Sequence, residues 1–498
     1  MSKPRTEQPT GPSLKLKTAR TLKWNIIDRV SQQVLYAVTG IVLARELSQT
    51  EFGLVGAVLI FQAFASLIID SGFSYALIQR RNPTRLDYST VLWFNIGMSG
   101  ALYALLWFSA PLIAEWFGSD ELIPLSRVMF LTFILNATAI VQANRFVKQM
   151  NVRPIAISNT LGLGLGAVVG IVMALTGYGV WAIVWQNIVG SSVKSLVLWL
   201  TARWLPLFRF SLKSLRSFMA VGMGMMATSF LNTVFLNLYS FVIGKCIGLA
   251  QLGYYTQSDK WSKMGISSIT QVLTSTTLPV LSEAQNDADR FSRIVHKFNR
   301  MAAYFVFPAM LGLAAEATPL FHTLFGAKWD ASIILFRILL IRGIFTTLTS
   351  LYSNYLLSLG KARLIVWMEV LRDGTAVIAL AATWPYLSLN TAAAPLLGIE
   401  ILLWGQLVAS VLAWGGTLWA VVAVTHITAR SMIADSIPYA SLSVGVACLA
   451  FFVGDIIAID WLGLICATTA GAALYLGINA LLHSRIQTDA VAYLRGRL

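Results

Sequence analysis

Charged side chains interrupt stretches of this sequence that are otherwise apolar enough to cross a membrane, and these residues carry the chemistry. The clearest case is segment 251–281, in which Asp259, Lys260 and Lys263 lie close together. A charge that faces lipid at the membrane centre costs about 2.5–3.5 kcal/mol, so such groups pair with each other or line water. Ammonium and guanidinium groups suit phosphate oxygens. The pattern therefore predicts a cationic cavity that binds an anionic head group of the diphosphate type.

Two sets of candidate residues follow from this reasoning. The candidates for substrate binding are the basic residues Arg29, Lys260, Lys263, Arg337 and Arg342. The candidates for coupling transport to an ion gradient are the acidic residues Asp28, Asp259 and Glu369. Simpler interpretations stay open, because Arg29 could extend to the cytosolic surface and Glu369 could pair with Arg372 and Asp373 along one helix face.

The polar residues of segment 251–281 fall on one face at the period of a helix, opposite Trp261 and Leu273. They are Thr256, Asp259, Lys263, Ser267, Thr270, Thr274 and Thr277. We expect this face to line a watery cavity. The alternative is an amphipathic helix on the membrane surface. The topology of the charges, given below, favours a helix that crosses.

The composition is typical of a polytopic membrane protein. Of the 498 residues, 57% are hydrophobic and 12% are charged, about half the charged fraction of a soluble domain. The net charge of +15 comes from basic residues in short loops, which is a topology signal and not a nucleic-acid footprint. The three cysteines and four histidines are scattered and predict neither disulfides nor a metal site. Because HExxH, Walker A and GxSxG motifs do not occur, we expect no enzyme activity and no cofactor.

The apolar segments predict an all-α fold with about fourteen transmembrane helices. They span 24–44, 52–78, 88–112, 123–146, 155–175, 179–202, 215–244, 251–281, 291–318, 331–359, 363–384, 396–426, 434–454 and 461–482. With the N-terminus in the cytosol, most lysines and arginines fall on the inner side, provided that 251–281 crosses. Both termini are then cytosolic. Residues 1–23 are polar and basic, and we expect a cytosolic tail without a cleavable signal.

The two halves of the chain resemble each other, which predicts a duplication. VLARELSQTEFG at 42–53 aligns with VIGKCIGLAQLG at 242–253, and NVRPIAISN at 151–159 with KARLIVWME at 361–369. Each repeat has six helices, so the copies share one orientation. The expected division is a lobe at 24–202, a linker at 203–214, a second lobe at 215–426, and two further helices with a cytosolic tail in 427–498.

Two shorter patterns carry structural expectations. Gly162, Gly166 and Gly170 recur every four residues, which predicts close packing of helices. The segment from Glu283 to Arg300 is rich in both charge signs, and we expect it to form an amphipathic helix on the inner surface.

Four motifs resemble those of a known family. They are ARELSQTEFGLVG at 44–56, GFSYALIQRR at 72–81, GYGVWAIVWQ at 177–186 and LGYYTQSDKWSKM at 252–264. Through these motifs the chain resembles Wzx-type (WzxC-like) polysaccharide exporters of the multidrug/oligosaccharidyl-lipid/polysaccharide flippase superfamily. The resemblance extends over nearly the whole chain. The resemblance implies two six-helix lobes in a V around a central cavity, two extra C-terminal helices, and a location in the bacterial inner membrane.

The same resemblance implies a function. The substrate would be an undecaprenyl-diphosphate-linked oligosaccharide, flipped from the cytosolic to the periplasmic leaflet by alternating access while its tail stays in membrane lipid. In the related lipid II flippases a cationic cavity holds the diphosphate, and Arg29, Lys260, Lys263 and Arg337 are the residues that would do so here. A polysaccharide polymerase and a chain-length regulator would be partners.

Two other functions stay open. A multidrug or cation antiporter of the same superfamily would share the architecture, but its cavity should be acidic. A membrane glycosyltransferase or polymerase would need a large outer loop with acid and base residues, and the apolar segments leave no room for one.

Overall fold

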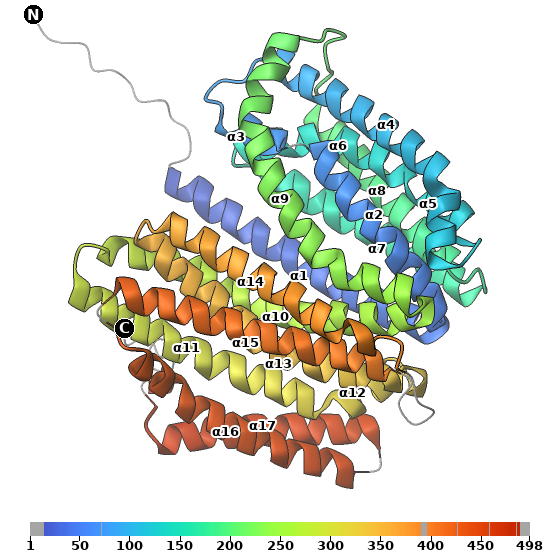
Figure 1. The fold of residues 1–498 in the computed structure, drawn as a ribbon. Helices are drawn as coiled ribbons and strands as arrows, with labels where there is room; N and C mark the ends of the chain where they lie inside the picture. Colours follow the sequence, from blue (N-terminus) through green and yellow to red (C-terminus); the bar gives the residue numbers. More distant parts are fainter. Residues whose placement is uncertain are drawn as a thin grey trace, which may run out of the picture. The chain divides into compact units, whose positions relative to one another are not determined.

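The computed structural model describes residues 14–70, 72–389, 396–425, 427–457, 459–484 and 486–488, and every regular element within them is a helix. By its internal contacts the chain divides into two compact units, Met1–Leu249 and Ala250–Leu498. The first runs from blue to green and the second from green to red in Figure 1. The predicted all-α membrane fold is confirmed, because each predicted apolar segment coincides with one helix or with two consecutive helices.

The first unit begins with a helix that is longer than its apolar part. α1 starts at Leu14, inside the stretch that we expect to be a tail, because Leu and Lys favour helix even where the chain is too polar to enter lipid. The helices of this unit are α1 (Leu14–Glu46), α2 (Gln49–Asp70), α3 (Phe73–Gln79), α4 (Arg85–Phe117), α5 (Leu122–Met129), α6 (Leu131–Lys148), α7 (Arg153–Leu175), α8 (Trp181–Ala202) and α9 (Leu212–Cys246). α9 packs against α2, α3 and α4, so it belongs to this unit by its contacts, whereas the repeat pattern groups 215–244 with the second lobe.

α7 and α8 pack closely along the predicted glycine row, and that prediction is confirmed. A Cβ atom on Gly162 would lie 2.6 Å from the carbonyl oxygen of Gly190, and one on Gly166 would lie 2.6 Å from that of Gln186. Any side chain at these positions would push the two backbones apart. The glycines therefore set the spacing of the two helices that carry most of the polar cavity described below.

The segment between α8 and α9 is bonded to α4 and is not a loose connector. Trp93 Nε1 donates to the carbonyl of Leu207 at 2.8 Å, and the Leu207 N–H donates to Ser89 Oγ at 2.8 Å. The Arg85 guanidinium donates to the carbonyl of Leu205 at 2.9 Å. These bonds satisfy backbone groups that regular structure would otherwise pair, so they hold segment 203–214 against the first unit.

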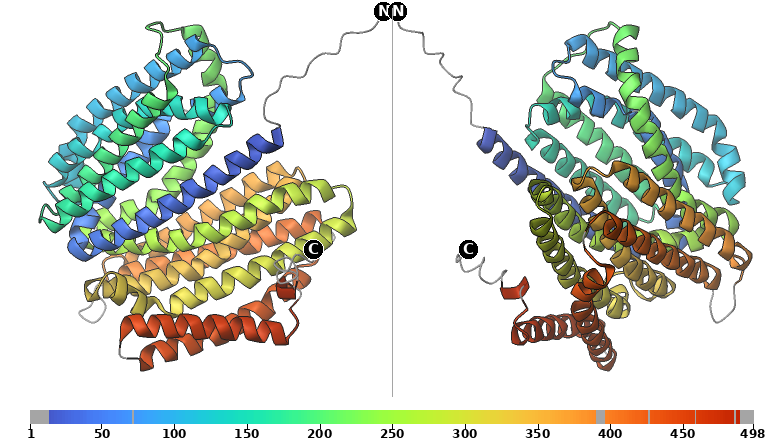
Figure 2. Two further views of the ribbon diagram at one scale, coloured as in Figure 1. Left: turned by 180° about the vertical axis from the view of Figure 1, so that it is seen from behind. Right: turned by 60° about the vertical axis from the view of Figure 1, so that its left-hand side comes forward.

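The second unit contains α10 (Leu249–Ala284), α11 (Ala288–Ala315), α12 (Ala317–Leu324), η1 (Ala327–Trp329), α13 (Asp330–Ser358), α14 (Ala362–Thr383), η2 (Trp384–Tyr386), α15 (Leu397–Val424), α16 (Ala429–Ile456) and α17 (Asp460–Leu481). Figure 2 shows α16 and α17 side by side at the edge of this unit, where α16 packs on α11. The expected surface helix from Glu283 to Arg300 does not exist. Instead, Asp287 caps α11 by accepting a bond from the N–H of Arg290 at 2.9 Å, and the helix continues from there into the apolar segment.

Eleven helices of the described residues are long and apolar enough to cross a membrane. The remaining three of the predicted fourteen are α1, α10 and α14, with 33, 36 and 22 residues. Even 22 residues span about 33 Å, enough for a hydrocarbon core of about 30 Å. These three helices are excluded by polarity and not by length, and they carry most of the candidate site residues: Asp28, Arg29, Asp259, Lys260, Lys263 and Glu369.

Candidate functional site

The charged segment of α10 consists of one ion pair and one further lysine. Lys263 Nζ lies 2.6 Å from Asp259 Oδ2 one helical turn away, and the two side chains are 48% and 17% exposed. Lys260 is exposed, with Nζ 5.5 Å from the ring centroid of the neighbouring Trp261. Because Asp259 neutralises Lys263, the segment keeps a positive charge on Lys260.

The opposite side of this segment anchors α10 to α13. Ser258 Oγ donates to the carbonyl of Ser332 at 2.9 Å, and Ser332 Oγ donates to the carbonyl of Tyr254 at 3.1 Å. Trp261 is buried and its Nε1 donates to Gln257 Oε1 at 3.0 Å. This reciprocal contact fixes the rotation of α10 about its axis. The side of the helix with Lys260 and Lys263 therefore faces away from α13.

The later part of the polar face of α10 packs against protein and does not line a cavity. The hydroxyl groups of Thr270 and Thr347 are 2.7 Å apart, and Asn354 Nδ2 donates to the carbonyl of Thr274 at 3.2 Å. Thr277 is fully buried. Helical spacing shows that these residues share a face but cannot show what that face meets. Exposed polar side chains nevertheless continue along α10 beyond Lys263, at Ser267, Gln271 and Ser275.

The two arginines of α13 differ from each other. Arg337 donates from Nε to the carbonyl of Ala314 and from one terminal nitrogen to Thr318 Oγ1, both at 3.0 Å. It thus binds a free carbonyl at the C-terminal end of α11, which is a structural role. Arg342 is half-buried, and its Nε has no hydrogen-bond partner among the described residues. Both arginines keep guanidinium donors to spare, but only Arg337 is held by two hydrogen bonds to neighbouring protein groups.

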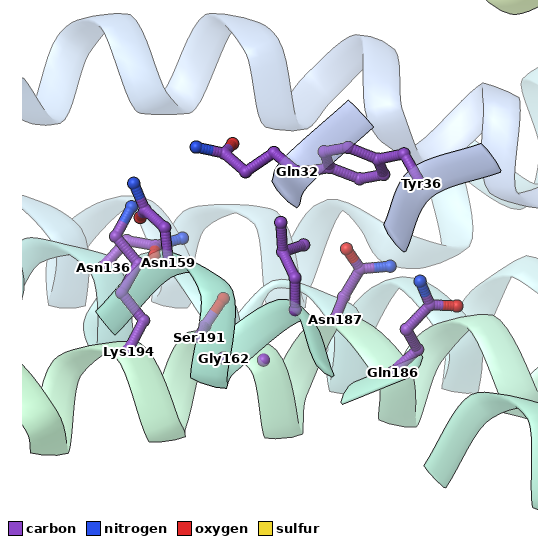
Figure 3. A pocket seen from close by; sticks show the side chains of 11 residues that line it. Gln32, Tyr36, Asn136, Asn159, Gly162, Gln186, Asn187, Ser191 and Lys194 are labelled. Atoms are coloured by element: carbon purple, nitrogen blue, oxygen red, sulfur yellow. The ribbon is translucent and has the colours of Figure 1, made fainter. Parts of the chain in front are cut away.

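A polar cavity lies inside the first unit, beside Asp28. It has a volume of about 170 Å³, room for several water molecules. Asn159 Nδ2 donates to both carboxylate oxygens of Asp28, at 3.3 and 3.2 Å. Figure 3 shows the amine end of Lys194 beside the side-chain amides of Asn136 and Asn159. Lys194 interacts electrostatically with Asp28, so the cation of this cavity lies near a half-buried carboxylate.

The other polar groups of this cavity come from four helices that are distant in sequence. α1 contributes Gln32 and Tyr36, α6 contributes Asn136, α7 contributes Asn159, and α8 contributes Gln186, Asn187, Ser191 and Lys194. Sequence reasoning selected Asp28 and missed this constellation. A signal was present on α8, where Asn187, Ser191 and Lys194 recur at helical spacing.

The remaining two candidates are isolated from these groups. Arg29 is exposed on α1, on a different side from the cavity that its neighbour Asp28 adjoins. Glu369 is exposed on α14, and the local pair forms without it, since Arg372 Nε lies 2.9 Å from Asp373 Oδ1. Within the described residues no group of His, Cys, Asp and Glu is arranged to hold a metal ion. The roles predicted for individual residues remain predictions.

Two of the four sequence motifs meet at one end of the first unit. Glu51 accepts bonds from the N–H and hydroxyl of Ser48 at 2.7 and 2.8 Å, which starts α2. Gly177 and Gly179, which precede α8, have φ angles of 83° and 55°, values that favour glycine. A Cβ atom on Gly179 would lie 2.3 Å from Glu51 Oε1. These motif residues therefore shape a turn that holds two helices together.

Helices long and apolar enough to cross a membrane, arranged in two compact units, define a polytopic membrane fold. The fold matches that of a structure described as the lipid II flippase MurJ in an inward closed conformation, with a TM-score of 0.76 over 93% of this chain and 99% of that one. It also matches an inward-facing multidrug resistance transporter of the MATE family, with a TM-score of 0.61 over 80% and 98%. Sequence identities are 13% and 17%, so these likenesses concern the fold.

The chain belongs to the polysaccharide biosynthesis protein family, whose model matches residues 42–334. It is 27% identical to the succinoglycan biosynthesis transport protein ExoT of Rhizobium meliloti (strain 1021), over 72% of this chain and 73% of that protein. It is 26% identical to the teichuronic acid biosynthesis protein TuaB of Bacillus subtilis (strain 168), over 72% and 74%. It is 24% identical to the lipopolysaccharide biosynthesis protein WzxC of Escherichia coli (strain K12), over 70% of this chain and 71% of that protein. The family resemblance seen in the four motifs is confirmed.

Proposed function

We propose that this protein is a polysaccharide transporter that moves an undecaprenyl-diphosphate-linked oligosaccharide from the cytosolic to the periplasmic leaflet of the bacterial inner membrane. Three findings support the proposal: the family, a relative described as a transport protein of succinoglycan biosynthesis, and a fold shared with a lipid II flippase. The sequence also agrees with a transporter better than with a synthetic enzyme, because the HExxH, Walker A and GxSxG motifs do not occur in it.

The observation that carries the substrate assignment is the exposed Lys260, on the side of α10 that faces away from α13. Asp259 pairs with Lys263 and leaves the positive charge of Lys260 in place. An ammonium group in a passage of low dielectric constant attracts an anion, and a diphosphate presents several charged oxygens to it. Lys263 is a weaker candidate, because Asp259 engages its ammonium group. Arg29 and Arg342 are further candidates, because Arg29 is exposed and Arg342 Nε has no hydrogen-bond partner among the described residues.

The transport step would be alternating access. The polyprenyl tail stays in lipid while the polar head group follows the cationic residues, and movement of the two units exposes the head group to each side in turn. Protonation or cation binding at Asp28 would couple this movement to a gradient, because Lys194 and Asn159 both respond to the charge of that carboxylate. Asp259 and Glu369 are the other candidates for coupling. The N- and C-termini would be cytosolic, and a polysaccharide polymerase and a chain-length regulator would act with the transporter.

Charge reversal tests the substrate assignment. Lys260→Glu together with Lys263→Glu should abolish flipping of a fluorescent lipid-linked oligosaccharide in proteoliposomes, while thermal stability and insertion stay close to those of the parent. The matched control is Lys361→Glu with Arg363→Glu, which changes the same number of exposed charges at the start of α14. Unchanged flipping in the α10 variant would refute the assignment. Flipping that ignores imposed proton and sodium gradients would refute ion coupling.

A drug-resistance assay on cells that express this protein distinguishes a flippase from an antiporter. A cation exporter needs acidic groups that face its substrate, whereas Asp28 has Lys194 beside it and Asp259 is paired with Lys263. Expression of the transporter should therefore give no resistance to cationic dyes. Resistance that depends on Asp28 would favour the antiporter.

A further inference from the structure

A basic pocket lies at one end of the second unit, away from the residues considered for transport. Its volume is about 730 Å³. Five of its lining residues are basic: Arg293, His296, Lys297 and Arg300 from the first turns of α11, and His483, which follows α17. The four residues of α11 occupy positions i, i+3, i+4 and i+7 and so share one helix face.

Among the residues that the structure describes, positive charge exceeds negative charge at this pocket. Asp435 of α16 contacts His296 Nδ1 through Oδ2, and its Oδ1 lies 3.8 Å from Arg300 Nε. That second distance is too long for a hydrogen bond, and Arg300 Nε is buried without a hydrogen-bond partner among the described residues. One carboxylate thus faces a group of basic side chains, one of which keeps an unused donor.

The walls of the pocket are fixed before any ligand arrives. Ile486 is 7% exposed and packs with Tyr439 and Tyr475 in an apolar cluster. The hydroxyl groups of Tyr439 and Ser484 are 3.1 Å apart, and Gln487 Nε2 donates to the carbonyl of Leu476 at 3.0 Å. These contacts hold the short segment after α17 against the pocket, so little ordering would be needed for binding.

Apolar side chains adjoin the charged group. Leu481 and Leu482 directly precede His483 and are 79% and 72% exposed. Ile433 and Ile437 flank Asp435 along α16 and are also exposed. A cluster of bases where an apolar helix ends matches a phospholipid, whose phosphate can meet the guanidinium groups while its chains cover the leucines. A free phosphate ion would have no use for the apolar border.

We propose that this pocket binds the phosphate group of an acidic phospholipid in the cytosolic leaflet. The proposal does not depend on the transported substrate. Bound lipid would tie α11, α16 and the segment after α17 together at the membrane surface and stabilise the second unit.

Thermal unfolding of the full-length protein in detergent tests the proposal. Phosphatidylglycerol should raise the melting temperature of the parent, whereas phosphatidylcholine should not. Arg293→Gln with Lys297→Gln should lose most of the phosphatidylglycerol shift. Both residues are exposed and Arg300 stays in place, so the fold should survive. The control is Lys361→Gln with Arg363→Gln, which removes the same charge from the exposed start of α14 and should keep the whole shift.

Three results would overturn the proposal: an equal shift in the pocket variant and the control, an equal shift with phosphatidylcholine, or full reproduction of the shift by millimolar inorganic phosphate. If the double variant proves unstable without lipid, Arg293→Gln alone is compared with Arg363→Gln. The lipid shift should then be smaller in the first.

Discussion

Removing Lys260 should harm transport far more than removing the ion pair beside it. Lys260→Gln deletes the unneutralised ammonium group, whereas Asp259→Asn with Lys263→Gln deletes one charge of each sign and leaves Lys260 in place. A hydrogen bond to a charged group is worth about 1.5–3 kcal/mol, so Lys260→Gln should lower the apparent affinity for the lipid-linked substrate roughly 10- to 150-fold. An exposed ion pair contributes about 0–1 kcal/mol, and the pair is 2.6 Å apart with Lys263 half exposed. The pair variant should therefore lose no more than about fivefold.

The assay is the concentration dependence of flipping in proteoliposomes that contain a fluorescent lipid-linked oligosaccharide. Melting temperatures of the three proteins give the folding control, and they should agree closely because none of the changed side chains is buried. A pair variant that loses as much affinity as Lys260→Gln would refute the reasoning. The same loss in Asp259→Asn alone would instead identify Asp259 as an ion-coupling carboxylate.

Three further experiments test helix packing in the first unit, the role of Arg337 in the second unit, and the coupling of Asp28 with Lys194. Gly166→Leu should lower stability by about 1–3 kcal/mol, because its side chain would enter the backbone of α8, while Gly164→Ala, which meets nothing within 4 Å, should leave the melting temperature unchanged. Arg337→Gln should lower the free energy of unfolding by about 1–3 kcal/mol through its two lost bonds, and expression should fall with it. Flipping per folded molecule should be retained. A selective loss of flipping would contradict the structural role of Arg337. Asp28→Asn and Lys194→Gln should be coupled by about 0.5–3 kcal/mol in a double-mutant cycle of unfolding free energies, whereas additive effects would show that the two groups do not interact.

The helices could be predicted from the sequence because each apolar stretch must satisfy its own backbone in lipid, which leaves few alternatives to a helix. The ion pair of Asp259 with Lys263 was not predicted, although their spacing along one helix permits it. The close packing of α7 and α8 also followed from local spacing of glycines. The features that could be predicted are those that depend on the residues of a single segment.

What could not be predicted depends on which helices meet. Thr270 and Thr277 have the spacing of a cavity-lining face, yet Thr270 contacts Thr347 of α13 and Thr277 is buried. The same polar face can bond to water or to another helix. The two bonds from Arg337 to Ala314 and Thr318 could not be predicted either, because both partners lie on other helices. The polar cavity beside Asp28 joins residues from four helices, and no single segment contains enough of them to indicate a site.

The side-chain environment of α10 near Lys263 tests the central claim most directly. Ser267→Cys, one turn beyond Lys263, is introduced after Cys246, Cys448 and Cys466 have been replaced by serine. We expect a membrane-impermeant thiol reagent to label it from the periplasmic side in spheroplasts and from the cytosolic side in inverted vesicles, with protection by substrate. Val408→Cys, in the exposed apolar stripe of α15, should react only with a lipid-soluble reagent. Labelling of Ser267→Cys from the cytosolic side alone, or only by the lipid-soluble reagent, would contradict the account.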